Sequence, residues 1–226
     1  MSNAHPLDRP VWSALNSGWS AYAEGDSRAL RLSPAFGPFG AAHDQSPESV
    51  AALQELVPPA GELWLVEAGP VTCPSGSRIV REARLTQMMA DAIAPGGRAV
   101  AFEPLDDRDA PEMQGLAELT RPGPFAARTH ALGDFIGVRI DGKIVAMAGE
   151  RMQVDGFSEV SGVCTHPDHR GQGYAGALIR VVAARILERG NKPFLHSYAD
   201  NEGAIALYES LGFHQRAAIG VTILTR

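Results

Sequence analysis

The stretch VSGVCTHPDHRGQGYAGALIRVV, residues 160–182, constrains the fold more than any other part of the chain. It begins as a strand-like run, passes through a glycine-rich loop and continues with apolar residues at helical spacing. A glycine loop that leads into a helix leaves backbone N–H groups at the positive end of the helix dipole, where they can bind an anion. We therefore expect an α/β protein with an anion-binding turn between this strand and this helix.

The same stretch contains side chains of the kind that bind metal ions. Cys164, His166 and His169 lie close together in the sequence. Zinc sites need three or four converging ligands, and these histidines flank Pro167 in a loop, outside a helix that would bring them together. No second Cys or His cluster supplies the missing ligands, so we predict no metal site, two loop histidines and a buried strand thiol.

A dinucleotide site is the second alternative for this stretch. Gly171, Gly173 and Gly176 spell the G-x-G-x-x-G fingerprint. In dinucleotide-binding folds the glycine turn follows the strand directly, whereas residues 166–170 intervene here. Too few residues remain after Asp200 for the βα units that would complete the binding crevice. A nucleotide-linked oxidoreductase is therefore the less favoured alternative.

The composition excludes several classes of function. A formal net charge of −6 argues against a surface for nucleic acid, which is normally bound by clustered Lys and Arg. The only cysteines, Cys73 and Cys164, form no C-x-x-C pair, so we expect no disulfide framework and a reducing compartment. No apolar run approaches the ~20 residues that span a bilayer, and the first residues lack the apolar core of a signal peptide. We expect a cytoplasmic protein with no nucleic-acid or membrane partner.

Proline and glycine at residues 94–97 (APGG) divide the chain into residues 1–96 and residues 97–226. The first part has no assigned role, and we expect it to be an α/β region that packs on or completes the second. Ser46 is the expected N-cap of one of its helices, which Pro58 ends. The elements predicted in this part are helices around 12–22, 47–56 and 79–89 and a strand at 62–67.

The second part has a clearer pattern. Asp141–Gly142, between two apolar alternations, predicts a β-hairpin. Helical spacing of apolar residues after the glycine loop predicts a helix that Gly190 ends. The predicted elements are a strand at 98–102, a helix at 110–119, strands at 135–140, 143–150 and 157–165, a helix at 174–189, a strand at 194–198, a helix at 201–210 and two final strands from residue 213 onward.

Two separated motifs in this part resemble those of a known family. Residues 163–175, VCTHPDHRGQGYA, resemble the V-x-x-x-P-x-x-R-G-x-G-x-A acetyl-CoA signature of the GNAT superfamily of N-acetyltransferases. Residues 201–213, NEGAIALYESLGF, resemble the N-x-x-A-x-x-L-Y-x-x-x-G-F motif of that family. The resemblance is strong from about Phe157 to Phe213, extends more weakly back to Arg98 and is not evident in residues 1–96. It implies an α+β fold with a mixed, mostly antiparallel central sheet flanked by helices.

The resemblance also implies binding roles for particular residues. Val163, Cys164 and Thr165 would pair with the pantetheine arm of acetyl-CoA. The residues that would hold the pyrophosphate are Arg170, Gly171, Gln172, Gly173, Tyr174 and Ala175. Asn201 would face the bound acetyl-CoA, unless it only caps a helix.

Three residues are candidates for proton transfer. Glu159 resembles by position the glutamate that some family members use as a base, although an exposed strand carboxylate is equally ordinary. His196 is a second candidate base. Tyr208 is the candidate acid for the departing thiolate, although the spacing also suits an amphipathic core residue. Seven residues make about two helical turns, so Tyr208 shares a helix face with Asn201.

The function that the resemblance implies is transfer of an acetyl group from acetyl-CoA to a primary amine, by direct attack on the thioester and without a metal. The acceptor would be an amine on a small molecule or a peptide, and no motif identifies it. Whether the protein forms a homodimer is open. A CoA-binding sensor or interaction module without catalysis is the alternative from a different class.

Overall fold

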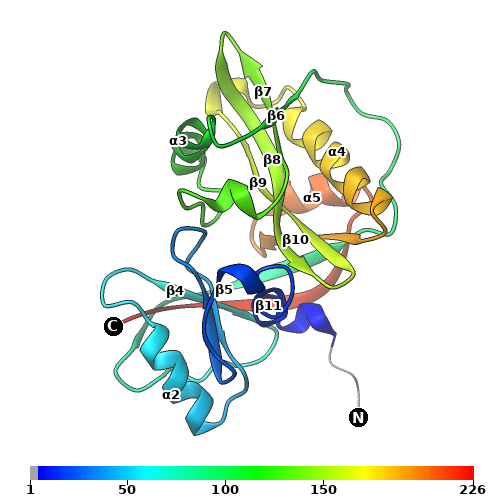
Figure 1. The fold of residues 1–226 in the computed structure, drawn as a ribbon. Helices are drawn as coiled ribbons and strands as arrows, with labels where there is room; N and C mark the ends of the chain where they lie inside the picture. The colour runs from blue at the N-terminus through cyan, green and yellow to red at the C-terminus, as the bar shows by residue number, and fades with distance from the viewer. Residues whose placement is uncertain (1–4) are drawn as a thin grey trace.

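An eight-stranded sheet forms the centre of the structure, a computed structural model that describes residues 5–226 (Figure 1). The strand order is β4-β11-β5-β10-β9-β8-β7-β6, and every neighbouring pair is antiparallel except β9 and β10. The strands are β4 (Leu63–Glu67), β5 (Arg78–Met89), β6 (Glu103–Leu105), β7 (Phe135–Ile140), β8 (Lys143–Val154), β9 (Phe157–Thr165), β10 (Lys192–Tyr198) and β11 (His214–Thr225). The predicted fold class, a mixed and mostly antiparallel sheet flanked by helices, is confirmed.

The parallel pair β9–β10 is short. It runs only from Lys192 opposite Phe157 to Phe194 opposite Glu159. Beyond this point β9 continues to pair with β8 as far as Thr165, and β10 continues to pair with β5. The sheet therefore opens between the last residues of β9 and the last residues of β10.

Helices cover both faces of the sheet. Figure 1 shows α4 (Tyr174–Glu188) and α5 (Glu202–Ser210) on one side and α3 (Ala110–Thr120) on the other. The two-residue period of β8 explains this arrangement, because Ala146 and Ala148 belong to the core cluster under α4, whereas Met147 packs with α3. None of the helices in the described part of the chain is both long and apolar enough to cross a bilayer.

Residues before position 96 build part of the same sheet. β5 lies between β10 and β11, and β4 forms one edge beside β11. Leu7, Leu15 and Trp19 are fully buried in the core cluster that also contains Val221 of β11. The remaining elements of this part are the helices α1 (Pro10–Leu15) and α2 (Pro47–Leu56) and a separate sheet of β1 (Ala23–Asp26), β2 (Ala29–Leu32) and β3 (Gly40–Ala42). Short 3-10 helices lie at Pro6–Asp8, Ser20–Tyr22, Thr129–Leu132 and Pro167–His169.

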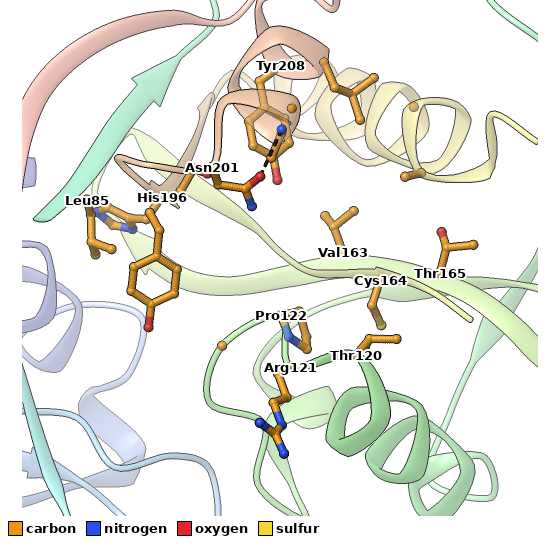
Figure 2. A pocket seen from close by; sticks show the side chains of 18 of the residues that line it. Leu85, Thr120, Arg121, Pro122, Val163, Cys164, Thr165, His196, Asn201 and Tyr208 are labelled. Carbon is orange, nitrogen blue, oxygen red and sulfur yellow. Dashed lines mark hydrogen bonds between the residues drawn. The ribbon is translucent and has the colours of Figure 1, made fainter. Parts of the chain in front are cut away.

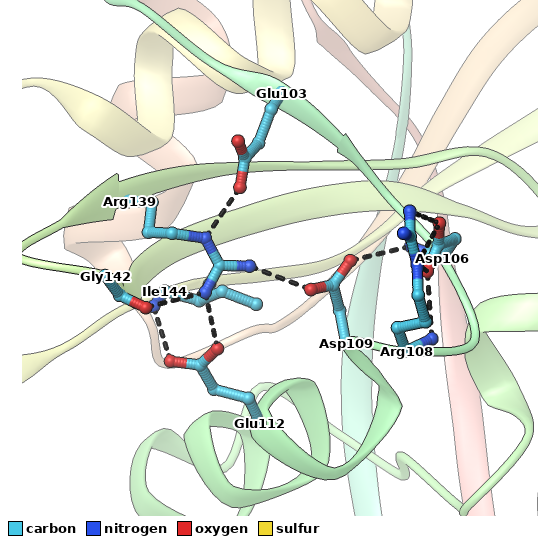
Figure 3. A network of polar contacts seen from close by, with 8 residues as sticks. All are labelled: Glu103, Asp106, Arg108, Asp109, Glu112, Arg139, Gly142 and Ile144. Carbon is cyan, nitrogen blue, oxygen red and sulfur yellow. Dashed lines mark hydrogen bonds and ion pairs between the residues drawn. The ribbon is translucent and has the colours of Figure 1, made fainter.

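An arginine joins α3 to the β7–β8 hairpin (Figure 3). Arg139 on β7 binds Glu103, Asp109 and Glu112 at 2.6, 2.8 and 2.7 Å. Glu112 also accepts a hydrogen bond from the amide of Ile144 at 2.6 Å. Since the loop after α3 borders the cavity described below, this network helps to place one wall of the site.

Several local predictions are confirmed by particular contacts. In the hairpin, Asp141 and Gly142 have φ values of 50° and 78°, the left-handed conformation that a two-residue turn of this kind requires. The Ser46 hydroxyl caps α2 by accepting a hydrogen bond from the amide of Ser49. The predicted strands at 62–67, 135–140 and 157–165 and the helices at 110–119, 174–189 and 201–210 are present within a residue or two of their predicted ends.

Other predictions are wrong. Residues 79–89 are not a helix but the strand β5, because pairing with β10 and β11 overrides the local helix-like pattern. Only Pro10–Leu15 of the helix predicted around 12–22 is α-helical. The chain from residue 213 forms one continuous strand, β11, instead of two, and absorbs an irregularity between Gln215 and Ala217 as a bulge.

The strand predicted at residues 98–102 is also absent, and the chain there is irregular up to β6. Side-chain contacts hold this segment against α4 and the loop before it. Arg98 donates to the carbonyl oxygen of Gln172 at 2.8 Å, and the Arg185 guanidinium lies over the Phe102 ring. An apolar alternation predicts a strand only where a partner strand is available, and this segment has none.

Candidate functional site

A cavity of about 720 Å³ opens where β9 and β10 separate, a size typical of small-molecule sites. In Figure 2 the end of β9 crosses the middle of the site, Tyr208 and Asn201 of α5 lie on one side of it, and the loop after α3 lies on the other. The predicted site residues that line the cavity are Val163, Cys164, Thr165, Arg170, Gly171, Gln172, Gly173, Tyr174, Ala175, His196, Asn201 and Tyr208. Glu159 is the exception.

The glycine loop has the geometry of an anion-binding turn. Gly171 and Gly173 have φ values of 75° and 78°, which glycine adopts without strain. A Cβ at Gly171 would meet no atom within 4 Å, so the backbone there is open to the cavity. Gly173 is the N-cap of α4 and provides no side-chain acceptor for the first amides of this helix. Those amides and the dipole of a 15-residue helix suit a phosphate group.

One residue at this loop, Arg98, was not predicted from the sequence. Its guanidinium donates to the carbonyl oxygen of Gln172 and lies 5.6 Å from the centroid of the Tyr174 ring. It brings a second guanidinium to the loop that contains Arg170. Arg98 lies in an irregular segment far from the loop in sequence, so no pattern of spacing connects the two.

The end of β9 is an open strand edge. Its register with β10 ends at Glu159, and within residues 5–226 no strand pairs with Val163–Thr165 on that side. The Cys164 side chain lines the cavity on the α3 side, near Thr120, and burial raises the pKa of its thiol to about 11. The rings of His166 and His169 pack against each other at 5.8 Å. Among the residues that the structure describes, no group of three or more potential ligands is placed to hold a metal ion.

Glu159 is buried beneath the cavity instead of lining it. Its side chain is 1% exposed, so the interpretation as an exposed strand carboxylate is wrong. The Arg151 guanidinium binds both carboxylate oxygens, at 2.9 and 3.1 Å, and His196 Nδ1 lies 2.9 Å from Oε1. Burial alone would raise the pKa of Glu159, but the Arg151 charge and the His196 contact outweigh it and lower the pKa to about 2. So acidic a group is a weak general base at neutral pH.

His196 lines the cavity, but both of its ring nitrogens are engaged. Nδ1 faces Glu159, and Nε2 lies 2.9 Å from Nε2 of Gln87. The Gln87 amide has a fixed orientation, because its nitrogen also donates to the carbonyl oxygen of Leu7 and its oxygen accepts from Arg216. Gln87 therefore donates to His196, and the proton of the neutral imidazole is on Nδ1. In this state neither ring nitrogen has a free lone pair.

Tyr208 reaches into the cavity from α5 (Figure 2). Its ring packs edge-on against Phe213, and its hydroxyl has no hydrogen-bond partner within residues 5–226. Burial raises its pKa, so the hydroxyl stays protonated over the physiological range. Asn201 caps α5 by accepting from the amide of Ala204 at 3.2 Å, a contact drawn in Figure 2. Its contact with acetyl-CoA stays a prediction.

The other half of the cavity is apolar and draws on both parts of the chain. Its lining includes Phe39, Trp64, Val66, Leu85, Met152 and Val221. The first four precede position 96, in the part to which the sequence assigned no role. No sequence signal marks them, because they are ordinary apolar residues on separate elements that only the folded sheet brings together.

Comparisons with known proteins agree with this geometry. Residues 136–219 match the family described as FR47-like protein. The chain is 48% identical to a solved structure from Novosphingobium aromaticivorans that is described as an acetyltransferase of the GNAT family. That match covers 98% of this chain and 99% of the other, with a TM-score of 0.91. It therefore includes nearly all of residues 1–96, where no family motif was evident.

More distant structures share the fold. A GCN5-related N-acetyltransferase from Kribbella flavida is 20% identical over 96% of this chain and 95% of its own, with a TM-score of 0.66. A GCN5-related N-acetyltransferase-like protein from Streptococcus suis is 16% identical over 95% and 92%, with a TM-score of 0.56. No curated protein matches the chain.

The environment of Glu159 generates a stability prediction. Glu159→Gln leaves the Arg151 charge buried without a counter-charge, and we expect a loss of ~3–5 kcal/mol in the free energy of unfolding. The folded-state pKa of about 2 lies below the ordinary 4.5, so the stabilisation is complete above pH 4.5 and is lost as the pH falls toward 2. Over this window the wild type should lose more stability than the variant, as measured by urea unfolding at each pH. The matched control is Glu55→Gln, which removes an exposed carboxylate 4.0 Å from Arg226 and should change little. If the wild type and Glu159→Gln lose the same amount of unfolding free energy as the pH falls, the lowered pKa of Glu159 is contradicted.

Proposed function

The chain belongs to the GNAT family of acetyltransferases, and on that premise we propose that it transfers the acetyl group of acetyl-CoA to a primary amine. The observation that supports this most is the presence in one cavity of the glycine turn, the open edge of β9 and the hydroxyl of Tyr208. These are an anion site, a set of unpaired backbone groups and a proton donor. Together they suit a nucleotide thioester and its leaving group.

The donor half of the cavity fits acetyl-CoA. The backbone amides from Gly171 to Ala175 and the guanidiniums of Arg170 and Arg98 would bind the pyrophosphate. The open edge at Val163–Thr165 would hydrogen-bond to the pantetheine arm. When bound, acetyl-CoA supplies a thioester carbonyl that a neutral amine can attack, and a backbone N–H of this edge would stabilise the oxyanion.

Proton removal from the acceptor is the step for which the candidate bases are least suited. Glu159 has a pKa of about 2, and His196 has both nitrogens engaged. We therefore assign Glu159 a positioning role: it holds the His196 ring and the Arg151 guanidinium in the cavity wall. The amine's proton leaves to solvent water, and the acceptor reacts as the fraction that is already neutral.

Tyr208 is the acid in this proposal. Its hydroxyl donates a proton to the departing sulfur and regains one, through water, from the attacking nitrogen, which loses this proton as the amide forms. A thiol has a pKa near ~8.5 and tyrosine one near ~10, which burial raises further here, so the transfer is not strongly driven. The hydroxyl therefore contributes mainly while charge develops on sulfur.

Thiol release tests the function as a whole. Incubation with acetyl-CoA and a panel of primary amines should release CoA thiol in an amine-dependent manner. A CoA-binding module without catalysis would bind CoA and release no thiol with any amine. An oxidoreductase would bind NADH, and NADH should not displace CoA here.

Deprotonation by solvent predicts a particular pH dependence. The value of kcat/KM should rise with pH and level off at the pKa of the acceptor amine. With two acceptors whose amines differ by about one pH unit in pKa, the midpoints should therefore differ by about one unit. A midpoint that stays fixed for all acceptors would show that a group of the protein is the base.

The glycine turn predicts a specific effect on CoA affinity. Gly173→Glu adds a side chain and a negative charge at the cap of α4, and we expect CoA affinity by calorimetry to fall by more than ~10-fold. The matched control is Gly142→Glu in the β7–β8 turn, where φ is also 78° and the strain is similar. If both variants bind CoA as the wild type does, the turn does not hold the pyrophosphate.

Tyr208→Phe tests the acid. The substitution keeps the ring and removes the hydroxyl, so kcat should fall by ~10²-fold while CoA affinity and melting temperature change little. Tyr22→Phe is the control, because Tyr22 packs on Phe36 outside the cavity. An undiminished kcat would leave Tyr208 with a packing role only.

A further inference from the structure

We propose that the acceptor is a free amino acid with an apolar side chain and that Arg121 binds its carboxylate. This inference rests on the proposed function and narrows its substrate class. It comes from the distribution of charge in the acceptor half of the cavity.

The cavity is lined by cations and by no carboxylate. Among the described residues, no Asp or Glu side chain lines it. Arg170 belongs to the glycine loop, and the charge of Arg151 is neutralised by Glu159. Arg121 is the remaining arginine, and within residues 5–226 no carboxylate lies within 4 Å of its guanidinium. An acceptor with further positive charges, such as a polyamine, would meet this charge without a compensating anion.

The backbone at Arg121 points to a role for its side chain. Arg121 ends α3 in the left-handed conformation, with φ 53° and ψ 56°. Helices usually place glycine there, because a side chain costs ~1 kcal/mol in this region. The side chain is exposed, and Figure 2 shows it extending from the loop after α3 at the border of the cavity. An arginine in a position that favours glycine suits a site in which the guanidinium binds a ligand.

Arg121 stands where the cavity meets an outer recess of about 620 Å³. The recess has a second arginine, Arg81, whose guanidinium lies 5.3 Å from the Tyr198 ring centroid. Its two carboxylates, Glu62 and Glu118, accept hydrogen bonds from Trp64 and Gln114 and lie outside the inner cavity.

An acceptor with its amine near Tyr208 and its carboxylate at Arg121 would therefore meet a cation at the border and an apolar floor beneath. Arginine binds carboxylates through two parallel hydrogen bonds, which gives both affinity and orientation. The floor of Phe39, Val66, Leu85 and Val221 suits an apolar side chain.

The experiment compares matched acceptors by thiol release. Leucine, methionine and phenylalanine are each paired with the corresponding carboxamide, which has the same side chain and no negative charge. The amine of a carboxamide is less basic than that of the acid, so a larger fraction of it is neutral and reactive. A higher kcat/KM for the acid therefore reports binding of its carboxylate. We expect at least one acid to exceed its amide in kcat/KM by ~10-fold or more. In Arg121→Gln the KM for the acid should rise until the preference disappears, while kcat stays similar. Arg121→Lys keeps a positive charge and should retain part of the preference.

Two controls separate this role from a structural one. Arg121→Gly should lose the preference while melting at the same or a higher temperature, because glycine relieves the left-handed strain. Arg84→Gln removes an exposed arginine of β5 that does not line the cavity, and the preference should remain. A reduced affinity for CoA in Arg121→Gln would overturn the inference, because Arg121 would then belong to the donor half.

A second arm does not depend on turnover. The N-acetyl derivatives of the same acids and amides are titrated calorimetrically into the CoA-loaded protein. We expect tighter binding of the N-acetyl acids, and loss of this difference in Arg121→Gln. Amides that react as well as acids overturn the inference and leave the proposed function intact. If no amine releases thiol, the proposed function fails, and equal binding of N-acetyl acids and amides then overturns the inference as well.

Discussion

The buried carboxylate of Glu159 holds three strands together at the point where the sheet opens. Glu159 belongs to the last residue pair between β9 and β10, and its side chain binds Arg151 of β8 and His196 of β10. Beyond this junction β9 and β10 part, and the cavity begins. A charged group at such a position is costly to bury, and the bidentate arginine and the imidazole offset that cost. The shape of the cavity therefore depends on a residue that does not line it.

The hydrogen bonds continue from this junction to the start of the chain. His196 accepts from Gln87 of β5, and Gln87 in turn donates to the backbone of Leu7. Asp8 pairs with Arg216 of β11, which also donates to Gln87. The N-terminal segment thus stabilises the apolar wall of the cavity, to which β4 and β5 also contribute lining residues. For this reason the two halves of the chain contribute to one site: in the proposed reaction the glycine turn and α5 would bind the donor, and residues before position 96 would contact the acceptor.

Charge is divided along the cavity in a way that suits two different ligands. The end proposed for the donor combines the amides at the start of α4 with Arg170, and Arg98 lies beside this loop. The middle is formed by the open edge of β9 and the neutral side chains of Cys164 and Tyr208, both of which burial keeps protonated. The end proposed for the acceptor has an apolar floor and an arginine at its border. An uncharged centre between two cationic ends suits a reaction in which a neutral amine attacks a neutral thioester.

The sequence by itself determined the features that depend only on residues close together in the chain. The turn at Asp141–Gly142, the capping of α2 and α5, and the strand, glycine loop and helix of residues 160–182 all follow from backbone preference and from spacing along a single element. Only the tertiary structure decided that residues 79–89 form an interior strand, that Glu159 is buried and paired with Arg151, and that Arg98 reaches the glycine loop. It also brought Trp64, Leu85 and Arg121 to one cavity. These outcomes depend on partners far away in the chain, because strand pairing, burial of a charge and the lining of a cavity are properties of several elements packed together.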